Sequence, residues 1–198
     1  KAPTADQILA AKAAGQLDGM TVCCASAGNH GLSVAAGAAI FGTACEVFLA
    51  QSVPESFADR LRAKGATVVR AGLVYEDAMA AAVARSKDQG VTLVSDASWE
   101  GELHVPSLVM QGYAVMAEEI CETFRAKDAW PTHVALQAGV GGIAASVTLH
   151  IRRNWDVQPE IIIVEPDRAA CLSHSVAAGH PVRADGAVSN MGRLDCKE

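Results

Sequence analysis

Short apolar stretches alternate with segments of helical character along almost the whole chain. The apolar stretches are bounded by glycine, proline or polar residues, which is typical of buried strands. Alanine and other helix formers fill the segments between them, and proline or glycine marks several of their ends. The pattern predicts strands at Thr21–Ala25, Glu46–Ala50, Thr67–Arg70, Val91–Ser95, His133–Gln137 and Glu160–Glu165, and helices at Gln7–Ala14, Leu32–Phe41, Pro54–Lys64, Tyr75–Ser86, Pro106–Arg125, Ile143–Arg153 and Arg168–Ala178.

This alternation predicts an α/β fold in which helices cover parallel sheets. The short links between elements favour right-handed crossovers. The long helix predicted at Pro106–Arg125 is a natural seam between two such units. We therefore place one domain at residues 15–104 and a second at residues 105–198.

Composition and charge exclude several classes of protein. The 198 residues are 51% hydrophobic and 19% charged, which is typical of a globular chain and not of a disordered one. The net charge is −6 and no basic run exceeds Arg152-Arg153, so a nucleic-acid binder is not expected. The uncharged run Leu32–Cys45 is shorter than a membrane span needs. The six cysteines form no C-x-x-C pair and no His lies at finger spacing from them, so we expect buried thiols and no metal site.

Two predicted strands are each followed by a glycine-rich turn and a helix. The first turn is Ser26-Ala27-Gly28-Asn29-His30-Gly31, and the second is Gly139-Val140-Gly141-Gly142-Ile143-Ala144. Free N–H groups and the helix dipole make such a helix start a binding site for anions. In open α/β sheets, ligands bind outside the carboxyl ends of the strands, where these turns lie.

The second turn alone leaves three interpretations open. It has the G-x-G-x-x-A form of a dinucleotide fingerprint, and Glu165 follows roughly 20 residues later, where an acid would bind a ribose. A different phosphate site and a purely structural turn are the other two interpretations. The first turn favours a phosphate site of another kind, because Asn29 and His30 have no role in a dinucleotide fingerprint.

Taken together, the two turns resemble the fold-type II, tryptophan-synthase-β-like family of pyridoxal-phosphate enzymes. Further segments resemble its diaminopropionate ammonia-lyases, and the resemblance covers most of the chain from about Gln7 onward. It implies two three-layer parallel-sheet units, residues 15–104 being the smaller domain and 105–198 part of the larger, with the chain incomplete at both ends. The segments that carry it are Ser95–Gly101, Met110–Tyr113, Gln137–Gly141, Val164–Asp167 and Leu194–Glu198.

The resemblance also implies roles for individual residues, with pyridoxal 5'-phosphate as the cofactor. Asn29 would hydrogen-bond the 3-hydroxyl group of the cofactor. Asp96 would be the acid–base group that removes the Cα proton of an L-amino acid. Backbone N–H groups would bind the substrate carboxylate at Ser26, Ala27, Gly28 and His30, and the cofactor phosphate at Gly139, Val140, Gly141, Gly142 and Ile143.

The chain departs from the family pattern at two positions. The family's ammonia-lyases carry an Asp, assigned to the D-substrate, where this chain has Ala27. A methyl group cannot take a proton, so we expect little turnover of D-amino acids. The Schiff-base lysine of the family precedes the first turn, where this chain has only Lys1 and Lys12. Lys1 is at about the spacing of the wider fold type, so we expect the catalytic lysine either at Lys1 or in a segment that precedes it.

The function that the resemblance implies is pyridoxal-phosphate-dependent β-elimination by a carbon–nitrogen lyase. The substrate would be a small L-amino acid such as L-2,3-diaminopropionate, and the products a keto acid and ammonia. It also implies a cytoplasmic homodimer that binds no nucleic acid, membrane or metal. A serine/threonine dehydratase-like or threonine synthase-like enzyme of the same fold, an NAD(P)-dependent dehydrogenase and an inactive fragment are the alternatives.

Overall fold

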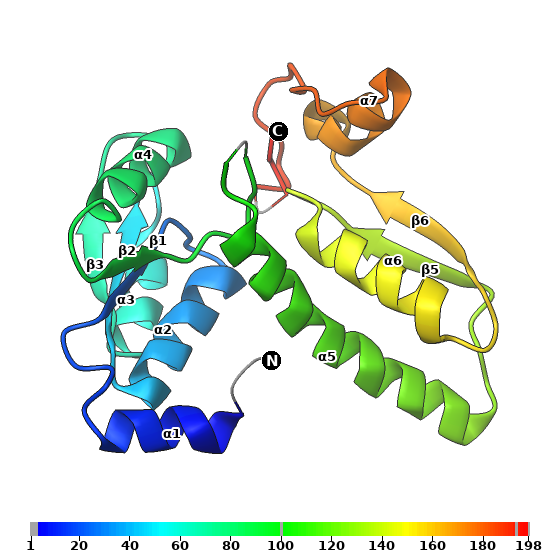
Figure 1. Cartoon of the computed structure of the whole chain (residues 1–198). Coiled ribbons are helices and arrows are strands. Elements are labelled where there is room, and N and C mark those ends of the chain that lie inside the picture. Colours follow the sequence, from blue (N-terminus) through cyan, green and yellow to red (C-terminus); the bar gives the residue numbers. More distant parts are fainter. Residues whose placement is uncertain (1–3, 100, 193, 198) are drawn as a thin grey trace. The chain divides into compact units, whose positions relative to one another are not determined.

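The computed structural model describes residues 4–99, 101–192 and 194–197 (Figure 1). The chain forms two compact units, Lys1–Ser95 and Asp96–Glu198. The predicted division into domains at residues 104 and 105 stays a prediction. Parallel strands and helices alternate in both units, which confirms the predicted α/β fold class. None of the helices in the described ranges is long and apolar enough to cross a membrane.

The first unit is built on a four-stranded parallel sheet with the strand order β3-β2-β1-β4. Strand β1 lies in the middle, so the turn that follows it opens at the centre of the carboxyl edge of the sheet. Its neighbouring residues Cys23 and Cys24 point to opposite faces, because side chains alternate along a strand. The strands are β1 (Thr21–Cys24), β2 (Ala44–Leu49), β3 (Thr67–Arg70) and β4 (Val91–Leu93).

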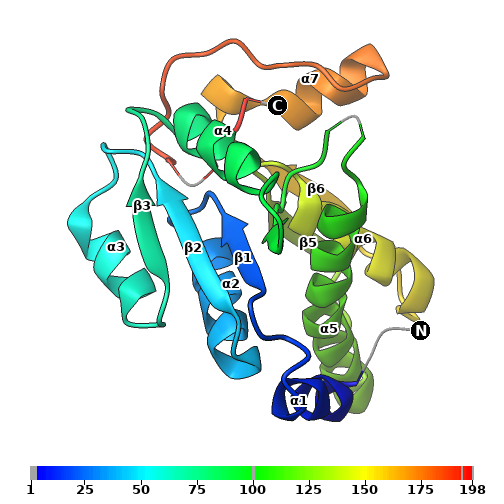
Figure 2. The same cartoon turned by 60° about the vertical axis from the view of Figure 1, so that its left-hand side comes forward.

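Helices cover both faces of this sheet, and Figure 2 shows α4 on the face opposite to α2 and α3. Val47, Leu49 and Leu61 are almost fully buried on the α2–α3 side. Burial of each such side chain contributes about 1.5–3 kcal/mol to the stability of the unit. Thr4 caps α1, accepting a hydrogen bond from the Gln7 N–H at 3.3 Å. The helices are α1 (Ala5–Ala13), α2 (Asn29–Phe41), α3 (Glu55–Arg62) and α4 (Tyr75–Arg85).

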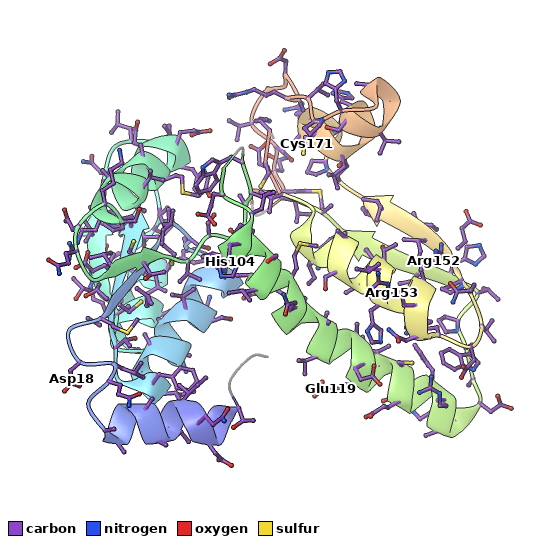
Figure 3. The ribbon with its side chains drawn as sticks, viewed as in Figure 1. Asp18, His104, Glu119, Arg152, Arg153 and Cys171 are labelled. Atoms are coloured by element: carbon purple, nitrogen blue, oxygen red, sulfur yellow. The ribbon has the colours of Figure 1, made fainter. Side chains whose placement is uncertain are left out.

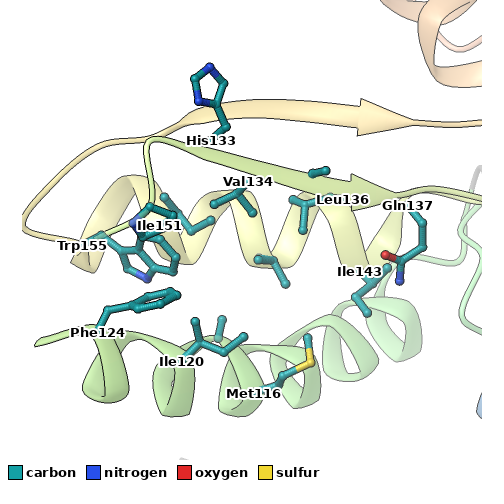
Figure 4. Close-up of a pocket in the computed structure, with 14 residues that line it drawn as sticks. Met116, Ile120, Phe124, His133, Val134, Leu136, Gln137, Ile143, Ile151 and Trp155 are labelled. Atoms are coloured by element: carbon teal, nitrogen blue, oxygen red, sulfur yellow. The ribbon is translucent and has the colours of Figure 1, made fainter. Parts of the chain in front are cut away.

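The second unit contains a parallel strand pair packed against two long helices. Ala117, Cys121, Val147 and Ile151 form its buried core between α5 and α6, and Trp155 closes one end of it. Val134 and Leu136 of β5 face the helices (Figure 4). The elements are α5 (His104–Lys127), β5 (His133–Gln137), α6 (Gly142–Asn154), β6 (Glu160–Val164), the 3-10 turn η1 (Asp167–Ala169) and α7 (Cys171–Ala178).

Candidate active site

The first glycine turn ends in a helix start with free donors. Helix α2 begins at Asn29, and no side chain caps it. The Leu32 N–H is the first to bond back, to the Gly28 carbonyl oxygen at 3.2 Å. The N–H groups of Asn29, His30 and Gly31 therefore have no acceptor among the residues that the structure describes. A helix of 13 residues directs the positive end of its dipole to the same point, so the turn is suited to bind an anion.

This turn is also closed tightly on itself. The Gly28 N–H donates to Ser26 Oγ at 3.3 Å. A Cβ atom on Gly31 would overlap the Ser26 carbonyl oxygen, so only glycine fits there without a backbone shift. Ala27 is half-buried and packs against the core, whereas Asn29 is exposed. The Asn29 side chain, which is predicted to bind the cofactor, is thus exposed on a tightly closed turn.

The His30 ring ties the turn to the end of strand β4. Its Nε2 lies 2.8 Å from the Val94 carbonyl oxygen, which can only accept, so Nε2 carries the proton. The Val94 N–H in turn donates to the Cys23 carbonyl oxygen at 2.8 Å. This contact fixes the start of α2 relative to the chain two residues before Asp96. The resemblance assigned only the backbone of His30, and the role of its ring was not predicted.

The second turn reaches its helix through a left-handed residue. Gly141 is the N-cap of α6 with φ 85°, a conformation that favours glycine. The Ala145 N–H bonds back to the Gly141 carbonyl oxygen at 2.9 Å. The N–H groups of Gly142, Ile143 and Ala144 are left without an acceptor in the described part of the chain. This donor-rich cradle without a side chain at Gly141 and Gly142 fits the phosphate of the predicted cofactor.

Asp96 lies beside this second turn. A Cβ atom on Gly142 would be 3.6 Å from the Asp96 carbonyl oxygen and 3.8 Å from Met110 Cγ. Burial raises the pKa of the Tyr113 phenol, and the negative charge of Asp96 raises it further. The second unit therefore brings Asp96, the start of α6 and Tyr113 into one neighbourhood. The sequence motif Met110–Tyr113 belonged to the resemblance, but it gave Tyr113 no role.

Two cysteines interact with the Gly139–Val140 peptide group. Cys171 Sγ donates to the Gly139 carbonyl oxygen at 3.7 Å, and Figure 3 labels this cysteine at the start of α7. Burial raises the pKa of the Cys196 thiol to about 11, an effect that a hydrogen bond from the Val140 N–H partly offsets. Both thiols are therefore uncharged near neutral pH, since burial also raises the pKa of Cys171. Neutral thiols leave the positive potential of the turn intact for an anion.

Glu165, the residue that supported the dinucleotide interpretation, is occupied as a helix cap. Its carboxylate oxygens accept from the Leu172 N–H at 3.2 Å and from the Ser173 N–H at 3.0 Å. An acid at the start of α7 also interacts favourably with the dipole of that helix. The cap explains the position of Glu165 without a ribose.

Elsewhere in the second unit, a cavity of about 400 Å³ lies between α5, α6 and β5 (Figure 4). Met116, Ile120, Phe124 and Trp155 make most of its wall apolar, so it offers little catalytic chemistry. Within the described ranges, no three His, Cys, Asp or Glu side chains gather as metal ligands would.

The structure shows the surroundings of the lysines that could bind the cofactor as a Schiff base. Lys1 lies outside the described residues. Lys12 donates to the Ile40 carbonyl oxygen at 2.7 Å, at the end of α2. Lys197 donates to the main-chain carbonyls of Arg168 and Ala187 and to the Asp195 carboxylate. Both side chains thus have structural partners, and Lys64, Lys87 and Lys127 are exposed.

Comparisons with known proteins identify relatives of this chain. The family model described as pyridoxal-phosphate dependent enzyme matches residues 1–198. The diaminopropionate ammonia-lyase of Escherichia coli K12 is 33% identical over 181 residues, which are 90% of this chain and 46% of that protein. The biosynthetic L-threonine dehydratase of the same strain is 32% identical over 161 residues, 81% of this chain and 29% of that protein. A crystal structure of the E. coli diaminopropionate ammonia-lyase with D-serine has a TM-score of 0.78 at 31% identity, covering 90% of this chain and 45% of that one.

These findings confirm the resemblance and the cofactor that the sequence predicted. The chain spans about half the length of the curated ammonia-lyase it matches. The roles of the individual site residues stay predictions, although the structure brings Ser26–Gly31 together in one unit and Asp96 with the Gly139–Ile143 turn in the other.

Proposed function

Because the chain belongs to the family of pyridoxal-phosphate-dependent enzymes, we propose that the protein catalyses β-elimination from a small L-amino acid and releases a keto acid and ammonia. The substrate we propose is L-2,3-diaminopropionate, because one relative is a diaminopropionate ammonia-lyase. Asp96 beside the donor-rich start of α6 is the observation that carries the proposal. L-Serine and L-threonine are the rival substrates, since another relative is an L-threonine dehydratase.

The second turn would hold the cofactor through its phosphate. Gly142 and Ile143 offer N–H groups that have no acceptor among the described residues. Gly139 and Gly141 let the backbone approach the phosphate oxygens closely, and Val140 lies between them. When bound, pyridoxal phosphate supplies the electron sink for negative charge at the Cα atom of an amino acid.

The first turn would orient the ring and the substrate. We assign the Asn29 side chain to the ring hydroxyl, since it is exposed beside free N–H groups. Of the amides proposed for the substrate carboxylate, that of Gly28 already donates to Ser26 Oγ, while that of His30 is free. Together with Ser26 and Ala27, these groups form a preorganised anion site, which lowers the cost of holding a carboxylate.

Asp96 would move the proton at Cα. Asp96 is half-buried and its main-chain carbonyl oxygen lies beside Gly142, at the start of α6, and its carboxylate can accept that proton. Positioned general bases contribute about 10²–10⁴ in rate. Ala27, in the first turn, cannot take a proton, so we propose that L-amino acids react and D-amino acids react far more slowly.

The test is release of ammonia and keto acid from each enantiomer by the full-length protein with pyridoxal phosphate. Asp96→Asn should lower the rate with L-substrates about 10²–10⁴-fold, because an amide accepts no proton at neutral pH. Asp18→Asn is the matched control, since Asp18 is exposed and belongs to neither turn. Ala27→Asp should raise the rate with D-substrates. Equal wild-type rates for D and L, or an undiminished Asp96→Asn variant, would contradict the assignment.

The lysine that holds the cofactor is assigned to Lys1 or to a segment that precedes it, because Lys12 and Lys197 have structural partners. Borohydride reduction with the cofactor and peptide mapping should leave both of these unlabelled.

We also infer a cytoplasmic homodimer from the resemblance. Light scattering of the full-length protein should give twice the mass of one chain, and cell fractionation should find it in the cytoplasm.

A further inference from the structure

Segment 184–197, which has no helix or strand in its described part, is fastened to η1 by Lys197, and the Arg168 guanidinium adds a longer hydrogen bond to the Val188 carbonyl oxygen at 3.4 Å. Lys197 Nζ lies 2.7 Å from the Arg168 carbonyl oxygen, 3.2 Å from the Ala187 carbonyl oxygen and 2.6 Å from Asp195 Oδ1. An ammonium group has three donors, so these acceptors use all of them. The side chains of Lys197 and Asp195 are only 18% and 12% exposed. This is a sheltered pair and not a solvated surface contact.

Further hydrogen bonds within segment 184–197 involve the residues of this pair. Asp195 Oδ2 accepts from the Ser189 N–H at 3.1 Å, and the Lys197 carbonyl oxygen accepts from the Ala184 N–H at 2.7 Å. The hydrogen bond from Lys197 holds the pKa of Asp195 below its usual range, so the carboxylate is charged near neutral pH. A Cβ atom on Gly186 would overlap the Arg168 carbonyl oxygen, so the segment runs directly against η1.

The fastened segment and η1 both touch the second glycine turn. The Val140 N–H lowers the pKa of the thiol of Cys196, the neighbour of Lys197 in the chain. From the other side, η1 leads into α7, where Cys171 bonds the Gly139 carbonyl oxygen and Leu172 Cδ2 lies 3.1 Å from the place of a Cβ on Gly141. Helix α7, which follows η1, therefore contacts the turn directly, and Lys197 fastens segment 184–197 to η1.

We infer that Lys197 is a positioning residue for the cofactor phosphate, acting by fastening segment 184–197 to η1 and so fixing the backbone of Gly139–Gly142. The inference rests on the proposed function, in which this turn holds the phosphate. Without the ammonium group, Asp195 is left as a sheltered charge with one backbone partner, and two carbonyl groups lose their donor. The segment is then held to η1 less firmly, through the longer bond from Arg168 to Val188, and the phosphate donors lose their fixed spacing.

The first experiment measures cofactor affinity in the full-length protein. Lys197→Met keeps the aliphatic stem and removes the donors, and it should weaken binding of pyridoxal phosphate about tenfold. Binding of pyridoxal, which lacks the phosphate, should not change. Lys127→Met is the matched control, because Lys127 is exposed at the end of α5 and far in sequence from the segment. An equal loss for both ligands would show a general structural role and overturn the inference.

A second variant guards against simple misfolding. Lys197→Met combined with Asp195→Leu leaves no unpaired charge, so the double variant should be more stable than Lys197→Met alone. Its affinity for pyridoxal phosphate should still be about tenfold weaker, because the carbonyl groups of Arg168 and Ala187 remain unfastened. Wild-type affinity in this double variant would overturn the inference.

The second experiment needs no cofactor. Labelling of Cys196 with a thiol reagent, followed by mass spectrometry, should be faster in Lys197→Met than in Lys127→Met. Cys23, which is fully buried, is the internal reference and should label equally slowly in both. Unchanged labelling of Cys196 would overturn the inference. If the wild-type protein bound no pyridoxal phosphate, the proposed function would fail, while the labelling result would still report on the fastening.

Discussion

The turn at Ser26–Gly31 enters its helix through ordinary backbone angles, whereas the turn at Gly139–Gly142 enters through a left-handed residue. Gly28, the N-cap of α2, has φ −96° and ψ −157°. Gly141, the N-cap of α6, has φ 85° and ψ −11°. Both turns follow a parallel strand and both leave three N–H groups of the helix start without an acceptor in the described part of the chain. Two different backbone conformations at the N-cap thus expose free N–H donors at the start of a helix.

The two turns also differ in what surrounds them. Gly31 faces the backbone of its own turn, since a Cβ there would overlap the Ser26 carbonyl oxygen. Gly141 faces a flexible side chain, Leu172, at 3.1 Å. The first turn is therefore rigid because of its own residues, and the second depends on η1, α7 and segment 184–197. We expect substitutions in the first turn to affect stability most, and substitutions in or behind the second to affect phosphate binding most.

The largest effect on stability is expected for Gly31→Ala. Alanine gains about 0.5–1 kcal/mol over glycine inside a helix. Overlap with a backbone carbonyl costs more, since overpacking a site costs about 1–3 kcal/mol even where side chains can move. The free energy of unfolding of the full-length protein should fall by roughly 2 kcal/mol, as measured by urea denaturation.

Gly37→Ala is the matched control, because Gly37 lies in the same helix with no atom within 4 Å of its missing Cβ. That variant should be as stable as the wild type or more stable by up to about 1 kcal/mol. If both variants behaved alike, the rigid closure of the first turn would be wrong.

The sequence predicted the alternating elements well, because glycine and proline residues mark the ends of apolar runs that have the length of a strand. It placed the start of α2 at Leu32 and not at Asn29, since a helix start without a side-chain cap has no local marker. It predicted one helix at Arg168–Ala178, where the structure has η1 followed by α7. Glu165 explains the difference, because its carboxylate caps the N–H groups of Leu172 and Ser173.

The candidate site was predictable where a motif carries it and not where distant residues meet. The glycine turns and Asp96 lie in short motifs, so the sequence alone could point to them. The contact of His30 with Val94 joins residues 64 positions apart, and that of Lys197 with Arg168 joins residues 29 positions apart. No periodicity or turn residue encodes such pairs, because they exist only once the parallel strands and η1 are in place.

For the second turn, Gly141→Val should weaken phosphate binding more than it weakens the fold. A β-branched residue at a positive φ costs about 1–2 kcal/mol or more, and the new side chain displaces Leu172. The amides of Gly142 and Ile143 then shift, so affinity for pyridoxal phosphate should fall more than about tenfold. Absorbance titration measures this.

Gly179→Val separates strain from phosphate binding. Gly179 ends α7 with φ 75° and has no atom within 4 Å of its missing Cβ. The variant should lose similar stability and keep its affinity for pyridoxal phosphate. Full cofactor affinity in Gly141→Val would show that the second turn does not hold the phosphate.

The smallest effect is expected for Gly28→Ala, three positions before Gly31 in the first turn. Its φ of −96° is open to any L-residue, and a Cβ would meet only Ser26 Oγ, at 3.8 Å. Alanine is a poorer N-cap than glycine, so the free energy of unfolding should fall by about 0.5 kcal/mol or less. The Gly28 N–H is kept, so the KM for the amino acid should change little. A loss as large as that of Gly31→Ala would mean that the first turn needs its glycines for backbone freedom, as the second does at Gly141. A raised KM with unchanged stability would mean instead that the substrate approaches Gly28 too closely for a Cβ atom.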